Sequence, residues 1–166
     1  LLNNSTIKQQ IGDRLQNLKR GQTAYLVVQD VDSFKKINDT NGHLFGDAVL
    51  CSFADELSNI FPEALKGRIG GDEFVFYVED MDREQLEERL KHLNRCMSDR
   101  YDDDKTGLHI SCSLGVAVTD GTVTDYNLLF QWADAALYQV KSKGKGTYYL
   151  LDVREGVALP GKSYLD

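Results

Sequence analysis

The stretch that decides the fold is Arg-Ile-Gly-Gly-Asp-Glu-Phe-Val-Phe-Tyr-Val-Glu, residues 68–79. Its adjacent glycines, Gly70 and Gly71, predict a tight turn with an open backbone, because a residue without Cβ tolerates positive φ and close approach by another group. The β-branched and aromatic residues at 74–78 are typical of a strand that is buried on at least one face. The stretch therefore predicts a β-hairpin with acidic side chains directly after its turn.

Those acidic side chains are Asp72 and Glu73. Two neighbouring carboxylates repel each other unless a cation or a proton lies between them. Hard oxygen ligands beside an open backbone suit Mg²⁺ that carries substrate phosphates. The alternative is an ordinary glycine turn with solvated acids, and the context of this short motif has to decide between the two.

A second acidic pair supplies that context. The apolar residues predict a strand over residues 24–31, which delivers Asp30 and Asp32 at its carboxyl end, with both side chains on the same side. We expect only part of this pair to be buried. Together with Asp72 and Glu73, it gives two acidic clusters at neighbouring strand ends, with lysines nearby. This layout is typical of two-metal phosphoryl transfer.

Length and composition set the bounds. The 166 residues fit one domain that can bury roughly two thirds of its unfolded surface, so no disulfide or structural metal is needed. No apolar run has the length of a membrane span and no signal peptide is visible, so the expected location is the cytoplasm without direct membrane contact. The net charge of −7 argues against a nucleic acid partner. The three cysteines are expected to be small apolar packing residues.

Apolar periodicity predicts the order of elements. Helical stripes are expected over residues 7–18, 50–60, 86–97 and 129–140, and strands over 24–31, 67–69, 74–78, 109–119 and 147–151. The first helix has Asn4 and Ser5 as capping candidates, the third has Asp82 with Gln85, and the last has Thr124. Asp102, Asp103 and Asp104 fall in a loop and are interpreted as solvated charges. This order predicts an α/β (α+β) sandwich with one mostly antiparallel sheet flanked by helices.

Three motifs occur in a characteristic order: Asp-Val-Asp-Ser-Phe-Lys-Lys-Ile-Asn-Asp at 30–39, Asn-Gly-His-Leu-Phe-Gly-Asp at 41–47, and Gly-Gly-Asp-Glu-Phe at 70–74. Together they resemble the GGDEF family, the diguanylate cyclase domains of bacteria. The resemblance covers residues 1–151 and implies a ferredoxin-like, nucleotide-cyclase palm-like fold. Residues 152–166 are expected to form a C-terminal tail. The first four residues resemble the back half of a motif that opens these domains, so we expect an excised domain that lacks an upstream sensor.

The resemblance also implies a role for each matching residue. It implies Asp30, Val31, Asp72 and Glu73 as ligands of Mg²⁺ (or Mn²⁺), Val31 through its backbone carbonyl. Catalytic roles fall on Asp72, Glu73 and Lys35, with Glu73 either a metal ligand or a base for the 3′-hydroxyl. Substrate binding is implied for Phe34, Asn38, Asp47, Gly70, Gly71, Lys141 and Lys145. Asn38 and Asp47 would contact guanine, Lys35 the phosphates, and Lys141 with Lys145 the β and γ phosphates.

This chain also departs from the family pattern. Lys145 stands where the family usually has Arg and Gly146 where it usually has Asn, which keeps the charge but loses bidentate phosphate contact. The family's product-inhibition motif, Arg-x-x-Asp, is replaced by residues 61–64, which read Phe-Pro-Glu-Ala. We therefore expect no inhibitory site there. The lysines near the end of the last helix also have an ordinary explanation, as complements of the helix dipole.

The sequence as a whole is interpreted as a diguanylate cyclase domain. It would condense two GTP into cyclic di-GMP and release pyrophosphate, with Mg²⁺, as a face-to-face homodimer in which each domain holds one GTP. The alternative is a catalytically silent domain that binds GTP and regulates a neighbouring domain. A mixed-nucleotide cyclase is disfavoured by Asp47, because family members of that kind usually change this residue.

Overall fold

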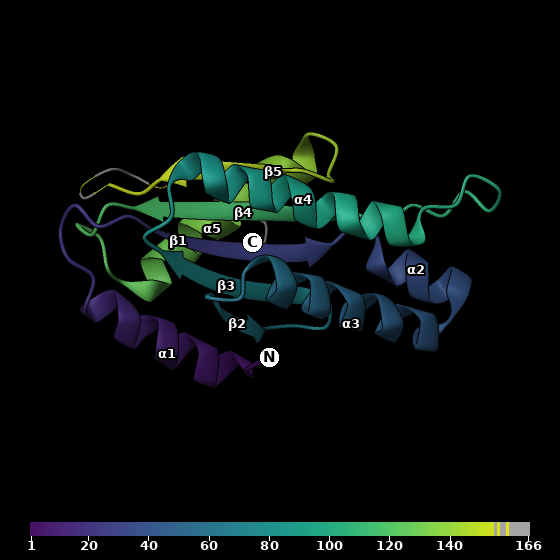
Figure 1. Ribbon diagram of the computed structural model, residues 1–166, viewed down its shortest axis with the longest axis horizontal. Helices are drawn as coiled ribbons and strands as arrows, with labels where there is room; N and C mark the ends of the chain where they lie inside the picture. Colours follow the sequence, from purple (N-terminus) through teal and green to yellow (C-terminus); the bar gives the residue numbers. More distant parts are fainter. Residues whose placement is uncertain (155, 157–158, 160–166) are drawn as a thin grey trace.

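The computed structural model describes residues 1–154, 156 and 159. Their elements follow in chain order: α1 Asn4–Gln16, β1 Ala24–Val31, α2 Phe34–Asn41, α3 His43–Ile60, β2 Leu65–Arg68, β3 Glu73–Glu79, α4 Arg83–Tyr101, β4 Cys112–Thr119, α5 Tyr126–Ser142 and β5 Tyr148–Asp152. The strands form one five-stranded sheet of order β2-β3-β1-β4-β5, with helices packed against it (Figure 1).

The predicted α+β sandwich with a mostly antiparallel sheet is confirmed. The central strand β1 pairs antiparallel with β3 and β4, β2 pairs antiparallel with β3, and only β4 and β5 run parallel. Every residue of β1 is buried, because apolar clusters cover both faces of the sheet. Tyr25 and Val27 belong to the cluster that includes α3 and α4, whereas Leu26 and Val28 belong to the cluster that includes α1 and α5.

The segment between β1 and β2 differs from the prediction. We expected one helix after residue 47, and the structure has two, α2 and α3, that meet at Gly42. Gly42 has φ 88°, in the left-handed region that favours glycine, and this turn separates the helices. The shorter helix, α2, was missed because Ile37 is its only fully buried residue, so it shows no apolar stripe.

Several predicted caps and boundaries are corrected by one to three residues. Asn3 caps α1 by accepting from the Thr6 backbone N–H at 2.9 Å, and the cap of α5 is Asp125 rather than Thr124. The predicted cap of α4 is confirmed, since Asp82 accepts from the Gln85 N–H at 2.8 Å. Strand β4 begins at Cys112, three residues later than the predicted 109, and is buried along its whole length.

The cysteines have different surroundings. Cys112 is fully buried in β4, as expected of a small apolar packing residue, but Cys51 is exposed and Cys96 is half-buried. Trp132, within the predicted last helix, is buried in the core. No helix among the described residues is long and apolar enough to cross a membrane.

The predicted domain boundary falls at the last strand. β5 extends to Asp152, and Val153 is buried and donates its backbone N–H to the Val118 carbonyl oxygen at 2.8 Å. The first residues of the predicted tail therefore still pack against the domain. Residues 155, 157–158 and 160–166 of that tail lie outside the described residues.

Candidate active site

The Gly-Gly turn joins β2 to β3. Contrary to the prediction, neither Gly70 nor Gly71 adopts a positive φ. A Cβ atom at Gly71 would meet nothing within 4 Å, and one at Gly70 would lie 3.2 Å from the Glu73 carboxylate. The exposed Arg68 ties the turn together, because its Nε donates to the carbonyl oxygens of Gly70 and Gly71 at 3.1 Å each. The glycines therefore keep the space beside the acids open, rather than supplying a left-handed turn.

Strand pairing brings the acids of the turn to the end of β1, at the right-hand end of the sheet in Figure 1. Asp30 lies opposite Glu73 in the β1–β3 register, and the Asp72 carbonyl oxygen accepts from the Val31 N–H at 3.2 Å. The four residues expected to bind metal are thus neighbours. The expectation that Asp30 and Asp32 are only partly buried is wrong: their exposed fractions are 4% and 7%, because α5 covers this face of β1.

The carboxylates perturb one another's protonation. Burial, a hydrogen bond with Asp30 and the charge of Asp30 raise the pKa of Asp72 to about 7. Burial raises the pKa of Glu73 as well, assisted by the charges of Asp30 and Asp134. Because the charge of Asp30 contributes to raising the pKa of both Asp72 and Glu73, a cation among these carboxylates would relieve their repulsion.

Asp134 is a member of this neighbourhood that sequence reasoning missed. It lies on α5 and is 2% exposed. The available signal was its position between the apolar residues Ala133 and Ala135, where an acid interrupts the predicted stripe of the helix. A buried acid in such a stripe has to find partners in the fold.

Lys141, at the end of α5, lies between the two acids of β1. Its Nζ is 3.0 Å from Asp30 Oδ2 and 2.8 Å from Asp32 Oδ1, and the lysine side chain is only 10% exposed. Burial by itself lowers the pKa of Lys141, but the hydrogen bond to Asp32 and the charges of both acids outweigh burial and raise this pKa. Lys141 is therefore a buried counter-charge of the acidic site, and the helix dipole alone does not explain its position.

The other two predicted lysines lie apart from the acids. Lys35 is exposed on the first turn of α2, and Lys145 is exposed in the loop between α5 and β5, with φ 68°. Within the described part of the chain, neither forms an ion pair with the acidic cluster. Phe34, which begins α2, is half-buried.

The predicted guanine contacts lie where α2 meets α3. Asn38 Oδ1 is buried and has no hydrogen-bond partner, and the neighbouring Asp47 carboxylate is exposed. A Cβ atom at Gly46 would be 1.8 Å from Asn38 Oδ1 and 3.2 Å from Phe34 Cζ, so only glycine leaves room for these side chains. A buried acceptor without a donor is costly, and a bound N–H group would satisfy it.

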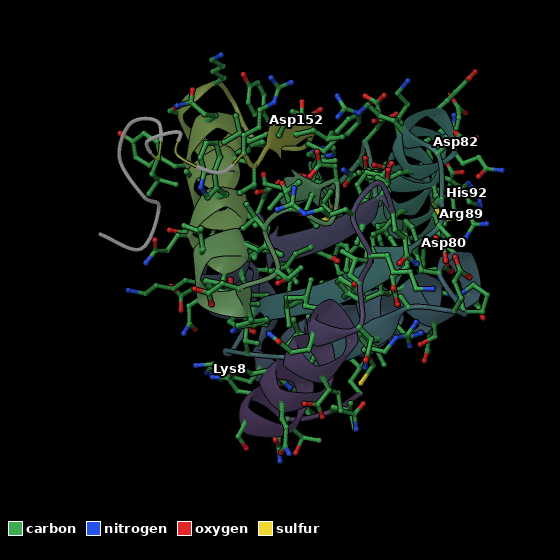
Figure 2. The ribbon with its side chains drawn as sticks, turned by 90° about the vertical axis from the view of Figure 1, so that its left-hand side faces the viewer. Lys8, Asp80, Asp82, Arg89, His92 and Asp152 are labelled. Carbon is green, nitrogen blue, oxygen red and sulfur yellow. The ribbon has the colours of Figure 1, made fainter. Side chains whose placement is uncertain are left out.

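The segment that replaces the inhibitory motif is filled by apolar groups. Phe61 and Ala64, at the two ends of the segment, are buried. Glu63 accepts from Arg89 Nη1 at 2.6 Å, and the Arg89 guanidinium also lies over the Phe61 ring, 5.7 Å from its centroid. Figure 2 shows Arg89 and His92 on the helix α4 side of the molecule. The arginine in this region is thus already paired within the chain.

A divalent cation fits the donors at the end of β1 by their chemistry. Carboxylate and carbonyl oxygens are the ligands that Mg²⁺ prefers, and a cation beside Asp72 would relieve the repulsion from Asp30 that, together with burial, raises the pKa of Asp72. Within the described residues, no group of three or more His, Cys, Asp or Glu side chains is already arranged as a metal site. Mg²⁺ would accordingly rely on one or two carboxylates, backbone oxygen and substrate phosphates, which is its usual mode of binding.

Acids grouped at one end of the sheet beside a lysine suit phosphoryl transfer, and comparison with known proteins gives the family of this domain. Residues 1–147 match the family described as "Diguanylate cyclase, GGDEF domain". The chain belongs to this family of nucleotidyltransferases.

Individual relatives of this chain have names that refer to the synthesis or the breakdown of cyclic di-GMP. The probable diguanylate cyclase DgcT of Escherichia coli is 31% identical over 84% of this chain, and the cyclic di-GMP phosphodiesterase PdeR of the same organism is 29% identical over 89%. The GGDEF domain of DgcB from Caulobacter crescentus, solved in complex with c-di-GMP, superposes with a TM-score of 0.77 at 26% identity, covering 90% of this chain and 91% of that one. The chain spans 32% of DgcT and 22% of PdeR.

Proposed function

We propose that this domain is a diguanylate cyclase that condenses two GTP molecules into cyclic di-GMP and releases pyrophosphate. The observation that carries the proposal is the grouping of Asp30, Asp72 and Glu73 at one end of the sheet, with Lys141 paired to Asp30. The raised pKa values of Asp72 and Glu73, close to this largely covered lysine, suit the transfer of an anionic phosphoryl group.

Guanine would be recognised between α2 and α3. The partnerless Asn38 Oδ1 and the exposed Asp47 carboxylate are acceptors for the N–H donors on guanine's Watson–Crick edge. Adenine presents a different edge, so these acceptors favour GTP over ATP. Phe34 would line this pocket beside Gly46.

The triphosphate would lie between the end of β1 and the Gly-Gly turn. The space beside Gly71 lets the phosphates approach the backbone, and Lys35, Lys141 and Lys145 would supply positive charge. Asp30, Asp72 and the Val31 carbonyl, with Glu73 as a further ligand or as the base, would hold Mg²⁺ or Mn²⁺. The bound cation would polarise the α-phosphate and neutralise charge that develops on it.

Two domains would meet face to face, each holding one GTP. The 3′-oxygen of one nucleotide forms a bond to the α-phosphorus of the other, the bond to the β-phosphate breaks, and pyrophosphate leaves with its electron pair. The 3′-hydroxyl proton passes to a base, for which Glu73 is the candidate in this chain. Two such steps close the ring. We further propose a cytoplasmic domain controlled by an upstream sensor, because GTP is supplied in the cytoplasm.

The second candidate is a silent GTP-binding domain that regulates a neighbouring domain. It is favoured by the similarity to PdeR, whose name gives a phosphodiesterase activity rather than a cyclase activity. The four implied metal-binding residues are all present in this chain, and this favours the cyclase.

One experiment separates the candidates. The domain is incubated with GTP and Mg²⁺, and the nucleotides are identified by chromatography and mass spectrometry. The cyclase yields cyclic di-GMP and pyrophosphate, and Asp72→Ala abolishes turnover while the domain stays folded by circular dichroism. GTP binding without any product would favour the regulatory domain. Retention of most activity by Asp72→Ala would contradict the assignment of the acids.

A further inference from the structure

Asp32 is a buried carboxylate at the site for which the proposed reaction gives no role. Four donors contact its two oxygens. Oδ1 accepts from Ser113 Oγ at 2.6 Å and Lys141 Nζ at 2.8 Å, and Oδ2 accepts from Ser111 Oγ at 2.7 Å and the Gly146 N–H at 3.0 Å. Because a carboxylate has about four acceptor positions, these donors satisfy Asp32 completely.

The donors come from three separate parts of the chain. Ser111 and Ser113 lie at the start of β4, Lys141 at the end of α5, and Gly146 in the loop that leads to β5. Ser113 Oγ also accepts from the Gly146 N–H at 3.1 Å, so the loop is bound twice. Asp32 thus ties the end of α5 and its following loop to the central strand.

The loop it ties down has an unusual backbone. Gly144, Lys145 and Gly146 have φ of 120°, 68° and 72°, so three consecutive residues have a positive φ, the region that favours glycine. The Lys145 N–H donates to the Val140 carbonyl oxygen at 3.0 Å, and the next N–H in the chain donates to Asp32. A non-glycine residue is strained in this conformation, so surrounding contacts must hold it. The contact with Asp32 is one that does so directly beside Lys145.

Lys141 is held in the same way. Its ammonium lies between Asp30 and Asp32, so Asp32 is one of the two carboxylates that hold the lysine at the site. A charge-assisted hydrogen bond in a buried place fixes a long side chain that would otherwise sample many rotamers.

We propose that Asp32 is a positioning residue that sets Lys141 and the residue 145–146 backbone for contact with the β and γ phosphates of the bound nucleotide. The inference rests on the proposed function, because these lysines meet phosphate only if the domain binds GTP. Asp32 acts through the lysines and touches neither the base nor the reacting oxygen.

The test compares the affinities of GTP and GMP, measured by calorimetry with Mg²⁺, for the wild-type domain and Asp32→Asn. Asparagine keeps the shape but turns one acceptor oxygen into an N–H₂ donor that faces other donors. We expect the Kd for GTP to rise about tenfold, as for the loss of one charge-assisted hydrogen bond. The Kd for GMP, which lacks the β and γ phosphates, is expected to stay the same. A general loss of structure would instead weaken the binding of both nucleotides.

Two further variants sharpen the test. Lys141→Met should weaken GTP binding selectively, and in Asp32→Asn/Lys141→Met the two losses should be far from additive if Asp32 acts through Lys141. Ser113→Ala removes one hydrogen bond to Asp32 and one from Gly146. It should therefore reduce the affinity for GTP, but not for GMP, by less than Asp32→Asn does. This milder variant decides the question if Asp32→Asn does not fold.

The matched control is Asp152→Asn. Asp152 is also a paired acid, 2.5 Å from Arg83 Nη2, but it lies at the end of β5 on the side of the molecule that faces the viewer in Figure 2. The substitution Asp152→Asn should leave the affinities for GTP and GMP unchanged. The role of Asp32 would be overturned if Asp32→Asn weakened the binding of GTP and GMP equally, or left GTP binding unchanged. It would also be overturned if the losses of GTP affinity in the double variant were additive. Absence of GTP binding by the wild-type domain would overturn the proposed function itself, and this role with it.

Discussion

At the scale of single residues, the site is defined by carboxylates that lie close enough together to repel one another. Asp72 contacts Asp30, and burial together with this contact raises its pKa to about 7 from an ordinary value of 3.8. The sequence identified Asp72 as important, but it could not give this value, because the shift depends on burial and on a residue 42 positions away. The effect of Asp134 on Glu73 could not be predicted from the sequence either, because it is α5 that brings Asp134 close enough to raise the pKa of Glu73.

The raised pKa of Asp72 predicts a pH-dependent stability of the metal-free domain. The folded state holds a proton that the unfolded chain releases, so this stabilisation is complete below about pH 3.8 and is lost as the pH rises through about 7. Asp72→Asn removes the titration. Its melting temperature relative to wild type should rise between pH 5 and pH 8, measured by thermal unfolding in EDTA. A difference that stays constant over this range would show that Asp72 titrates normally.

Base recognition gives the second prediction at this scale. Asp47→Ala should remove an acceptor for guanine and reduce the preference for GTP over ATP by about 1–3 kcal/mol, the usual cost of leaving a buried polar group unpaired. The measurement is the ratio of the two nucleotide affinities. Asp47 is exposed in the free domain, so the substitution should leave the melting temperature nearly unchanged. An unchanged ratio would mean that Asp47 does not read the base.

At the scale of elements, the sequence predicted the sheet and most helices but not how the site closes. Within the described residues, the strands and all helices except α2 could be placed, because runs of β-branched and aromatic residues mark buried strands and apolar residues recur every three to four positions in the helices. The helix α2 could not, since it buries one residue. The close approach of α5 to β1, which buries both Asp30 and Asp32, depends on tertiary packing and left no periodic signal.

The packing of α5 on β4 gives an element-scale prediction. A Cβ atom at Gly115 would lie 2.0 Å from the Ala133 carbonyl oxygen and 2.4 Å from the Leu137 nitrogen, both in the backbone of α5. Gly115→Ala should therefore push α5 away and destabilise the domain by about 1–3 kcal/mol or more, as overpacking does. Gly71→Ala is the control, because its Cβ would meet nothing within 4 Å. Equal stabilities of the two variants in urea unfolding would contradict this packing.

At the scale of the whole molecule, the proposed reaction would make regulation depend on how two domains meet. Residues 61–64 offer no charged Arg-x-x-Asp pair, and the nearby Arg89 is bonded to Glu63 within the chain. We therefore expect cyclic di-GMP not to inhibit through this surface, and control to come from assembly of the two half-sites. For separate domains, the effective concentration of one half-site near another is the bulk protein concentration.

The proposed cyclase activity is tested by the initial rate of cyclic di-GMP formation from GTP and Mg²⁺, measured against domain concentration. We expect the rate per domain to rise steeply with concentration. A fused dimeric coiled coil should raise this rate at low concentration, and added cyclic di-GMP should leave it unchanged. A rate per domain that stays flat on dilution would contradict assembly from separate half-sites. Failure to form cyclic di-GMP at any concentration, even when tethered, would contradict the assignment as a cyclase.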